Sequence, residues 1–136
     1  MLVTMLRLKG KHAFVFGVAS EDSIAWAICK SLAEAGVILH LGFQKRFMSR
    51  VFKLKDQLPA IAGFYPLDVA TDADTKSFFD EFSKANPGIK ADIMIHAIGF
   101  APRECFDRPI QFVDDDKINT AMTISANSLQ RCHKHA

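Results

Sequence analysis

The chain has 136 residues, of which 49% are hydrophobic and 24% are charged, and its formal net charge is +2. This length suits one domain, and the apolar content excludes an intrinsically disordered chain. The small net charge predicts no nucleic-acid partner. No apolar stretch reaches the roughly 18 residues of a membrane-spanning helix, so we expect no membrane contact.

Targeting and redox signals are both weak. The opening segment Met1–Leu6 is interrupted at once by Arg7, so we expect no signal peptide. The cysteines Cys29, Cys105 and Cys132 form no CxxC pair, and an odd number leaves at least one thiol unpaired. Both features are typical of a cytoplasmic protein.

Short apolar runs alternate with longer amphipathic segments along the chain. The runs show little alternation of polar and apolar residues and predict strands buried on both faces, at His12–Phe16, Val37–Phe43, Ile61–Leu67 and Asp92–Ile98. The amphipathic segments predict helices at Ser23–Ala35, Lys45–Leu58, Thr71–Ala85 and about Val113–His133.

Residue spacing predicts which helix faces are buried. In the first helix, residues three and four apart form an apolar stripe made of Ile24, Ile28, Leu32 and Ala35. In the third helix, the corresponding face consists of Phe78, Phe79 and Phe82. Gly36 and Pro87–Gly88 directly follow these helices and are typical helix ends.

The alternating order of strands and helices predicts an α/β fold built on a parallel sheet. About four strands with flanking helices would make the first half of a doubly wound fold. Such sheets bind ligands at the carboxyl ends of their strands, near the point where the strand order reverses. The four strand-to-helix junctions are therefore the places to look for function.

The first two junctions carry groups suited to a nucleotide. Gly17 permits a tight turn after the first strand, and the helix that begins near Ser23 offers unpaired N–H groups to a pyrophosphate. A helix-capping loop explains the same residues equally well. At the second junction, Gln44 replaces the acid that usually binds a ribose 2′-hydroxyl, while Lys45 and Arg46 could accommodate a 2′-phosphate. A plain polar loop is the alternative there.

The third and fourth junctions could hold flat rings. Asp68 is placed to accept a hydrogen bond from an exocyclic amine such as that of adenine, although a helix-capping aspartate is the commoner explanation. Gly99 would let a ring or ribose lie against the backbone. Phe100 and Ala101 would begin the wall of an acyl-sized pocket.

Taken together, the junctions resemble one family, the bacterial enoyl-acyl-carrier-protein reductases, which are divergent short-chain dehydrogenases/reductases. The matching motifs are Leu8–Lys11, Gly17–Ser20, Ser23–Ala25, Gln44, Asp68–Val69 and His96–Pro102. The Ser-Ile-Ala that starts six residues after Gly17, and the later Ile-Gly-Phe-Ala-Pro, are specific to that group. The resemblance extends from about Leu6 to Leu129.

The resemblance implies that residues 1–136 are a single, partial Rossmann-type NAD-binding domain. The family transfers a hydride from NADH, with NADPH as a possible substitute, to the β-carbon of a trans-2-enoyl thioester on acyl carrier protein. This reaction completes each elongation cycle of fatty acid biosynthesis. The intact family is usually a homo-oligomer, so the resemblance implies acyl carrier protein and further copies of the chain as partners.

The resemblance also implies a set of cofactor-binding residues: Gly17, Ser23, Ile24, Gln44, Asp68, Val69, Ile98 and Gly99. The first three would hold the pyrophosphate, Gln44 would contact the adenosine ribose, and Asp68 with Val69 would contact adenine. Ile98 and Gly99 would lie along the ribose on the nicotinamide side. The backbone of Ala101 would touch the substrate thioester.

The family's catalytic pair is a Tyr followed by a Lys seven residues later. The single tyrosine here is Tyr65, and Asp72 occupies the position seven residues on. We therefore expect no catalytic residue within the chain, which would be the first half of such a reductase, ending before the catalytic pair and inactive alone. A second departure is Asn127, where the family commonly has Tyr, and this predicts different packing of the last helix.

Other functions have less support. A phosphoacceptor receiver domain needs clustered acids after the first strand, where this chain has Gly17. A non-catalytic dinucleotide-binding or interaction module remains the main alternative. We expect no metal site, because the potential ligands in Cys132–His135 lack a further ligand and a fixed geometry. Loss of a neighbouring strand would leave Ile93–Ile95 on an open edge and favour self-association.

Overall fold

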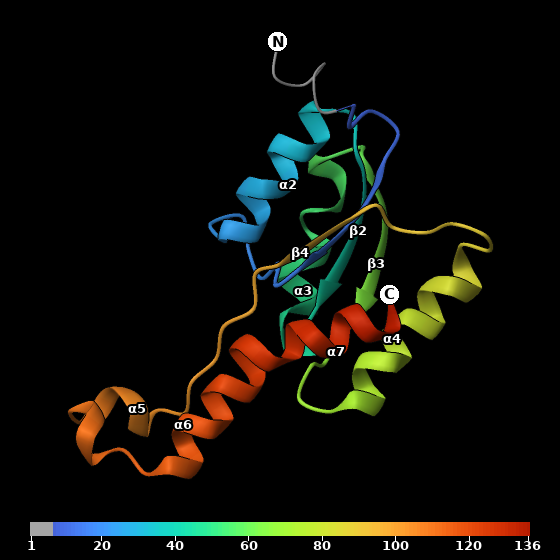
Figure 1. Ribbon diagram of the computed structural model, residues 1–136. Coiled ribbons are helices and arrows are strands. Elements are labelled where there is room, and N and C mark those ends of the chain that lie inside the picture. Colours follow the sequence, from blue (N-terminus) through green and yellow to red (C-terminus); the bar gives the residue numbers. More distant parts are fainter. Residues whose placement is uncertain (1–6) are drawn as a thin grey trace.

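Four parallel strands form a sheet in the order β3-β2-β1-β4 (Figure 1). The computed structural model describes residues 7–136, so the opening segment Met1–Leu6 lies outside the described residues. The strands are β1 (His12–Phe16), β2 (Ile38–Phe43), β3 (Ile61–Pro66) and β4 (Ile93–His96). The strand order reverses between β1 and β4, as a doubly wound sheet requires.

Helices connect the strands. They are α2 (Ile24–Glu34), α3 (Met48–Phe52), α4 (Asp72–Ala85), α5 (Glu104–Asp107), α6 (Asp115–Met122) and α7 (Ser128–His135). Short 3₁₀ turns cover Lys45–Phe47, Lys55–Gln57 and Ile110–Phe112. A π-helical segment, Thr123–Asn127, joins α6 to α7. The part that contains α5 and the start of α6 extends away from the sheet (Figure 1).

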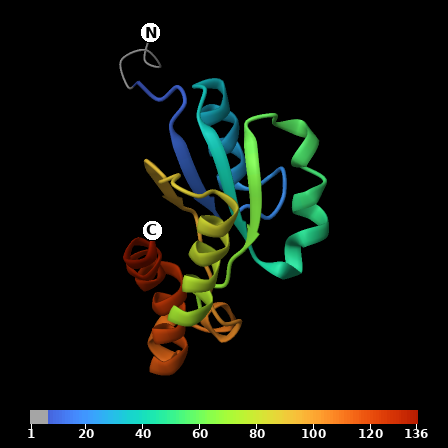
Figure 2. The same ribbon diagram turned by 90° about the vertical axis from the view of Figure 1, so that its right-hand side faces the viewer.

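The helices cover both faces of the sheet (Figure 2). On one face, Trp26 and Cys29 of α2 and Val51 of α3 pack against the sheet in one apolar cluster. On the other face, the rings of Phe78, Phe79 and Phe82 from α4 and the Cys132 side chain of α7 pack against Phe14 and Phe16. Both clusters exclude water, and this two-sided burial confirms the predicted fold class.

The predicted inward stripe of α2 is partly confirmed and partly wrong: Ala35 is buried and Leu32 packs against the core cluster, but Ile24 does not turn inward. Ile24 is 78% exposed, whereas Ala25, Trp26 and Cys29 are buried. Each residue turns an α-helix by about 100°, so the burial of the large Trp26 ring rotates Ile24 out to solvent.

The predicted helix Lys45–Leu58 is also wrong as a single element. Only five residues form α3, with 3₁₀ turns on either side. Within this segment Val51 and Leu54 are the fully buried side chains, so little packing supports a longer helix. The fourth strand is shorter than predicted and ends at His96, because its neighbour β1 ends at Phe16.

The last helix begins two residues later than predicted and continues to His135. Asn127 lies on its exposed side, and the π-helical turn at that point does not interrupt the helix. Within the described residues β4 pairs with β1 alone, which confirms that it is an edge strand. None of the helices in residues 7–136 is long and apolar enough to cross a membrane.

Candidate dinucleotide-binding site

Backbone hydrogen bonds align the carboxyl ends of all four strands in one row. They run from Leu67 N to Phe43 O (2.8 Å), from Gly17 N to Gly42 O (3.2 Å) and from Ala97 N to Phe16 O (3.0 Å). Each bond extends a strand pairing by one residue beyond the sheet. The four junctions singled out by the sequence therefore lie side by side at one edge.

A cleft of about 230 Å³ opens between these strand ends, and five of the predicted residues line it: Gly17, Gln44, Val69, Ile98 and Gly99. A neighbouring hollow shares Gln44 with the cleft and includes Asp68. Phe100 lines both spaces. The next residue, Ala101, lines neither of them. Ser23 and Ile24 also lie outside the lining, at the start of α2.

Gly17 must be glycine for a geometric reason. Its φ is +97°, and a Cβ at this position would overlap the carbonyl of Ala97, with 2.7 Å to the carbonyl carbon. An L side chain would be strained by this backbone conformation and excluded by the contact. The turn after β1 is therefore in close backbone contact with the turn after β4.

Ser23 caps α2. Its hydroxyl accepts from the Trp26 N–H at 3.2 Å and donates to the Ser20 carbonyl at 2.7 Å. Ile24 is the first helical residue, and its N–H has no acceptor within the helix. The helix-capping explanation of Ser23 is therefore correct. It is compatible with an anion at the helix start, because the cap satisfies the Trp26 N–H and not that of Ile24.

The second junction presents both neutral and basic groups to the cleft. Gln44 is half-buried and lines both spaces, as does Arg46. The Arg46 guanidinium lies 4.7 Å above the ring of Phe47, and Lys45 lines the outer hollow. A ribose beside Gln44 would meet both Gln44 and Arg46 in the cleft, with Lys45 farther out in the hollow.

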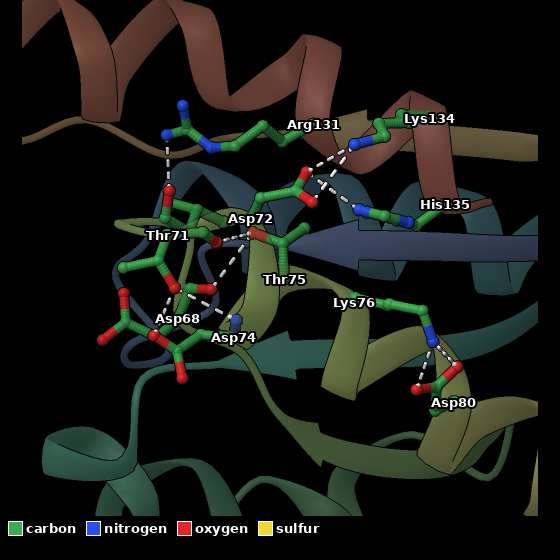
Figure 3. A network of polar contacts seen from close by, with 11 residues as sticks. Asp68, Thr71, Asp72, Asp74, Thr75, Lys76, Asp80, Arg131, Lys134 and His135 are labelled. Carbon is green, nitrogen blue, oxygen red and sulfur yellow. Dashed lines mark hydrogen bonds and ion pairs between the residues drawn. The ribbon is translucent and has the colours of Figure 1, made fainter.

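The loop after β3 is held by its own side chains (Figure 3). The exposed carboxylate of Asp68 accepts from the Ala70 N–H at 2.9 Å. Thr71 caps α4 by accepting from the Asp74 N–H at 3.1 Å, so the helix-capping explanation of Asp68 is wrong. Val69 is 2% exposed and can offer the cleft only its backbone.

Side chains of the last helix form hydrogen bonds with the end of β4 and the loop that follows it. The Ser125 hydroxyl accepts from the Phe100 N–H and donates to the Phe100 carbonyl, both at 2.9 Å. The Ser128 hydroxyl lies 2.7 Å from His96 Nε2, and burial lowers the pKa of that imidazole. Sequence reasoning missed both serines. Their three-residue spacing, which Arg131 continues, was the available signal.

The cleft and the neighbouring hollow are contiguous and differ in the side chains that they present. A Cβ on Gly99 would meet nothing within 4 Å, so no protein group requires glycine there. The polar side chains Gln44 and Asp68 lie toward one end, and the small residues Gly17 and Gly99 lie between apolar walls. This distribution matches a dinucleotide whose polar adenosine end lies beside β2 and β3.

Tyr65, Cys29 and Cys132 lie outside the cleft lining. The Tyr65 hydroxyl accepts from Asn86 Nδ2 at 2.8 Å, and its ring packs against Phe78 and Phe82. Burial raises the pKa of the Cys29 thiol to about 12 and that of Cys132 to about 11, which makes both unreactive. Within residues 7–136 no three His, Cys, Asp or Glu side chains gather as metal ligands.

Known proteins share this sequence pattern and this fold. The enoyl-acyl-carrier-protein reductase family model matches residues 17–136. The NADH-dependent enoyl-acyl-carrier-protein reductase FabI of Synechocystis sp. is 35% identical over 137 residues, covering 97% of this chain and 52% of the relative.

Two solved enoyl-acyl-carrier-protein reductases are also similar. The Aquifex aeolicus enzyme superposes with a TM-score of 0.84 at 31% identity, covering 94% of this chain and 54% of that protein. The Bacillus cereus enzyme, solved with NADP⁺ and an indole naphthyridinone, gives a TM-score of 0.87 at 31% identity, covering 95% of this chain and 50% of that one. The chain thus spans about half the length of these relatives. It belongs to the enoyl-acyl-carrier-protein reductase family.

Proposed function

We propose that this chain is the dinucleotide-binding part of an NADH-dependent enoyl-acyl-carrier-protein reductase of fatty acid biosynthesis. The observation that carries the proposal is the shared cleft, in which Gly17, Gln44, Val69, Ile98 and Gly99 meet at the carboxyl edge of the sheet. When bound, the cofactor supplies a hydride for the β-carbon of a trans-2-enoyl thioester. The residues of this chain bind and orient it.

Each junction has a proposed task. The N–H of Ile24 and the turn at Gly17 accommodate the pyrophosphate, because a helix start favours an anion and glycine lets it approach the backbone. Gln44 bonds the adenosine ribose. The Asp68 carboxylate accepts from the adenine amine while the Val69 N–H donates to the ring.

The fourth junction serves the reacting end. Ile98 and Gly99 lie along the ribose on the nicotinamide side, where the open space at Gly99 leaves room for it. Ala101 contacts the thioester through its backbone. No step of proton transfer is assigned to Tyr65, because its hydroxyl is engaged by Asn86 and its side chain is outside the cleft lining.

The proposal is tested by titrating the chain into NADH, followed by fluorescence, beside a turnover assay with an enoyl thioester. We expect saturable NADH binding without turnover by this chain alone. Absence of binding by a chain shown to be folded by circular dichroism would refute the proposal. Turnover would refute the view that the chain lacks catalytic residues.

The alternative is a non-catalytic dinucleotide-binding module, which the engaged Tyr65 side chain favours. The two functions are separated by adding acyl carrier protein. A reductase part should bind enoyl-acyl carrier protein more tightly when NADH is present, because Ala101 would contact the thioester beside the nicotinamide. A module with no reductase role should show no such coupling.

We further propose acyl carrier protein and a second copy of this chain as partners, in the cytoplasm. Self-association is supported by the half-buried apolar residues Ile93, Met94 and Ile95 on edge strand β4. Sedimentation velocity should show concentration-dependent dimers or larger species. A well-folded chain that sediments only as a monomer would contradict self-association without affecting cofactor binding.

A further inference from the structure

The loop proposed to hold adenine is bound from outside by a side chain that lies far away in the sequence. Arg131 of α7 lies beside the loop that contains Asp68 and Thr71 (Figure 3). Its Nη2 donates to the Val69 carbonyl at 2.6 Å and to the Thr123 carbonyl at 2.9 Å. Arg131 lines neither the cleft nor the outer hollow. Any effect of Arg131 on a bound ligand must therefore pass through the loop.

The remaining hydrogen bonds of the loop involve the two peptides on either side of Val69. The Thr75 hydroxyl lies 3.3 Å from the Asp68 carbonyl, and the Ala70 N–H is bonded to the Asp68 carboxylate. In a planar trans peptide the C=O and the N–H point in opposite directions. The Thr75 hydroxyl lies closer to the Thr71 carbonyl, at 2.8 Å, so its contact with the Asp68 carbonyl is the weaker of the two. Arg131 fixes the next peptide, Val69–Ala70, through its carbonyl, and the N–H of that peptide is the one bonded to the Asp68 carboxylate.

A guanidinium suits this position better than a neutral donor. A hydrogen bond from a charged donor is stronger than one between neutral groups, and Arg131 Nε is buried without a partner among the described residues. Breaking the contact with Val69 would leave the charge with still fewer acceptors. The same helix is held to α4 by Lys134 and His135, which pair with Asp72 at 3.1 Å and 2.9 Å.

We propose that Arg131 is a positioning residue for adenine recognition: it holds the Val69–Ala70 peptide, whose N–H bonds the Asp68 carboxylate, and so keeps that carboxylate in place as an acceptor for the base beside the Val69 N–H donor. This inference rests on the proposed function. Arg131 does not touch the ligand. Selectivity for the base of the dinucleotide therefore depends on the contact between α7 and the loop after β3.

The test compares the affinity of the chain for NADH with its affinity for nicotinamide hypoxanthine dinucleotide in the reduced form. The hypoxanthine analogue replaces the 6-amino group by an oxygen and places a proton on the adjacent ring nitrogen, so donor and acceptor are exchanged. The wild-type chain should prefer NADH at least tenfold. Arg131→Met, which keeps the apolar stem, should reduce this preference to less than threefold.

Two further variants separate positioning from simple stability. Arg131→Lys keeps one charged donor and should restore most of the preference, and Lys134→Gln, which weakens only the pairing with Asp72, should keep it. If Arg131→Met does not fold, Arg131→Gln supplies the neutral comparison. An unchanged preference in folded Arg131→Met or Arg131→Gln would overturn the inference, as would an equal loss of affinity for both dinucleotides.

The same measurements distinguish this inference from the proposed function. If the wild-type chain binds neither dinucleotide, the proposed function fails. If it binds both without preference, adenine recognition by Asp68 and Val69 fails, and the positioning role fails with it. If the wild-type chain discriminates and the Arg131 variants do so equally, only the positioning role is wrong.

Discussion

Gly17 lies directly against the carbonyl of Ala97, leaving no room between them for a Cβ atom. This contact joins the end of β1 to the end of β4 at the point where the strand order reverses. Gly17 and Ala97 both line the cleft, so this contact forms part of its wall. Glycine is therefore required at position 17 by the packing of the two turns, independently of any role in ligand binding.

Gly17→Ala should lower the free energy of unfolding by more than about 2 kcal/mol, because left-handed backbone strain adds to the overlap with Ala97. Gly88→Ala is the matched control, since Gly88 has a φ of +79° but a Cβ there would meet nothing within 4 Å. That variant should lose only about 1 kcal/mol. Urea denaturation measures both, and equal losses would contradict the close contact.

Gly99→Val should leave the free energy of unfolding almost unchanged and weaken NADH binding. The open space around Gly99 predicts a change in unfolding free energy within about 0.5 kcal/mol, as for surface substitutions. The added methyl groups would occupy the space proposed for ribose, so NADH affinity should fall about tenfold, or ~1.4 kcal/mol. Calorimetric titration checks the affinity, and unchanged NADH binding would argue against a ligand at this position.

The stability of the chain should decrease as pH falls from 6.5 to 4. Burial, and secondarily the charge of His12, lowers the pKa of His40 to about 4. Its Nε2 lies 2.9 Å from His12 Nδ1, and its Nδ1 is buried without a hydrogen-bond partner among the described residues. The unfolded chain therefore binds a proton in this pH range that the folded chain does not. This difference lowers the free energy of unfolding by about 3 kcal/mol between pH 6.5 and 4.

His40→Leu should flatten that part of the stability profile, measured by urea denaturation at several pH values. The half-buried His96, whose pKa is also lowered, would retain a smaller slope of the same sign. A wild-type stability that is flat from pH 6.5 to 4 would contradict the burial of a neutral His40.

Cofactor choice should depend on the two cations after Gln44. The double variant Lys45→Ala/Arg46→Ala should lose at least tenfold in NADPH affinity, because a charge-assisted hydrogen bond contributes about 1.5–3 kcal/mol. NADH binding should change little, since Gln44 remains. The exposed Lys53 lies outside both spaces, and Lys53→Ala controls for a general loss of positive charge. Equal losses for both cofactors would place these cations elsewhere.

Strand positions and strand ends were predictable because they depend on local composition. The run His12–Phe16 is apolar after its first residue, and the structure forms β1 at those residues. Gly17, Gln44 and Asp68 follow such runs, so parallel strand order was sufficient to predict that they share one edge. Helix phase was harder. The spacing of Ile24 and Ile28 is helical, but the packing of Trp26 decides which face turns inward.

Contacts between distant segments could not be read from the sequence. Arg131 and Val69 are 62 residues apart, and nothing in either local sequence specifies that the side chain of one reaches the carbonyl of the other. The same holds for Ser128 and His96, which meet only because α7 crosses the strand ends. These contacts depend on how α7 packs, and Cys132 of α7 packs in the cluster of phenylalanine rings from β1 and α4.

The most direct test of one dinucleotide-binding site at the four strand ends is hydrogen–deuterium exchange of the folded chain with and without saturating NADH. The shared cleft predicts slower exchange at all four junctions together, in peptides covering residues 17–24, 44–46, 68–71 and 97–101. The face of α2 that packs on the sheet should not change. Protection at one junction alone, or at none under saturating NADH, would contradict the account.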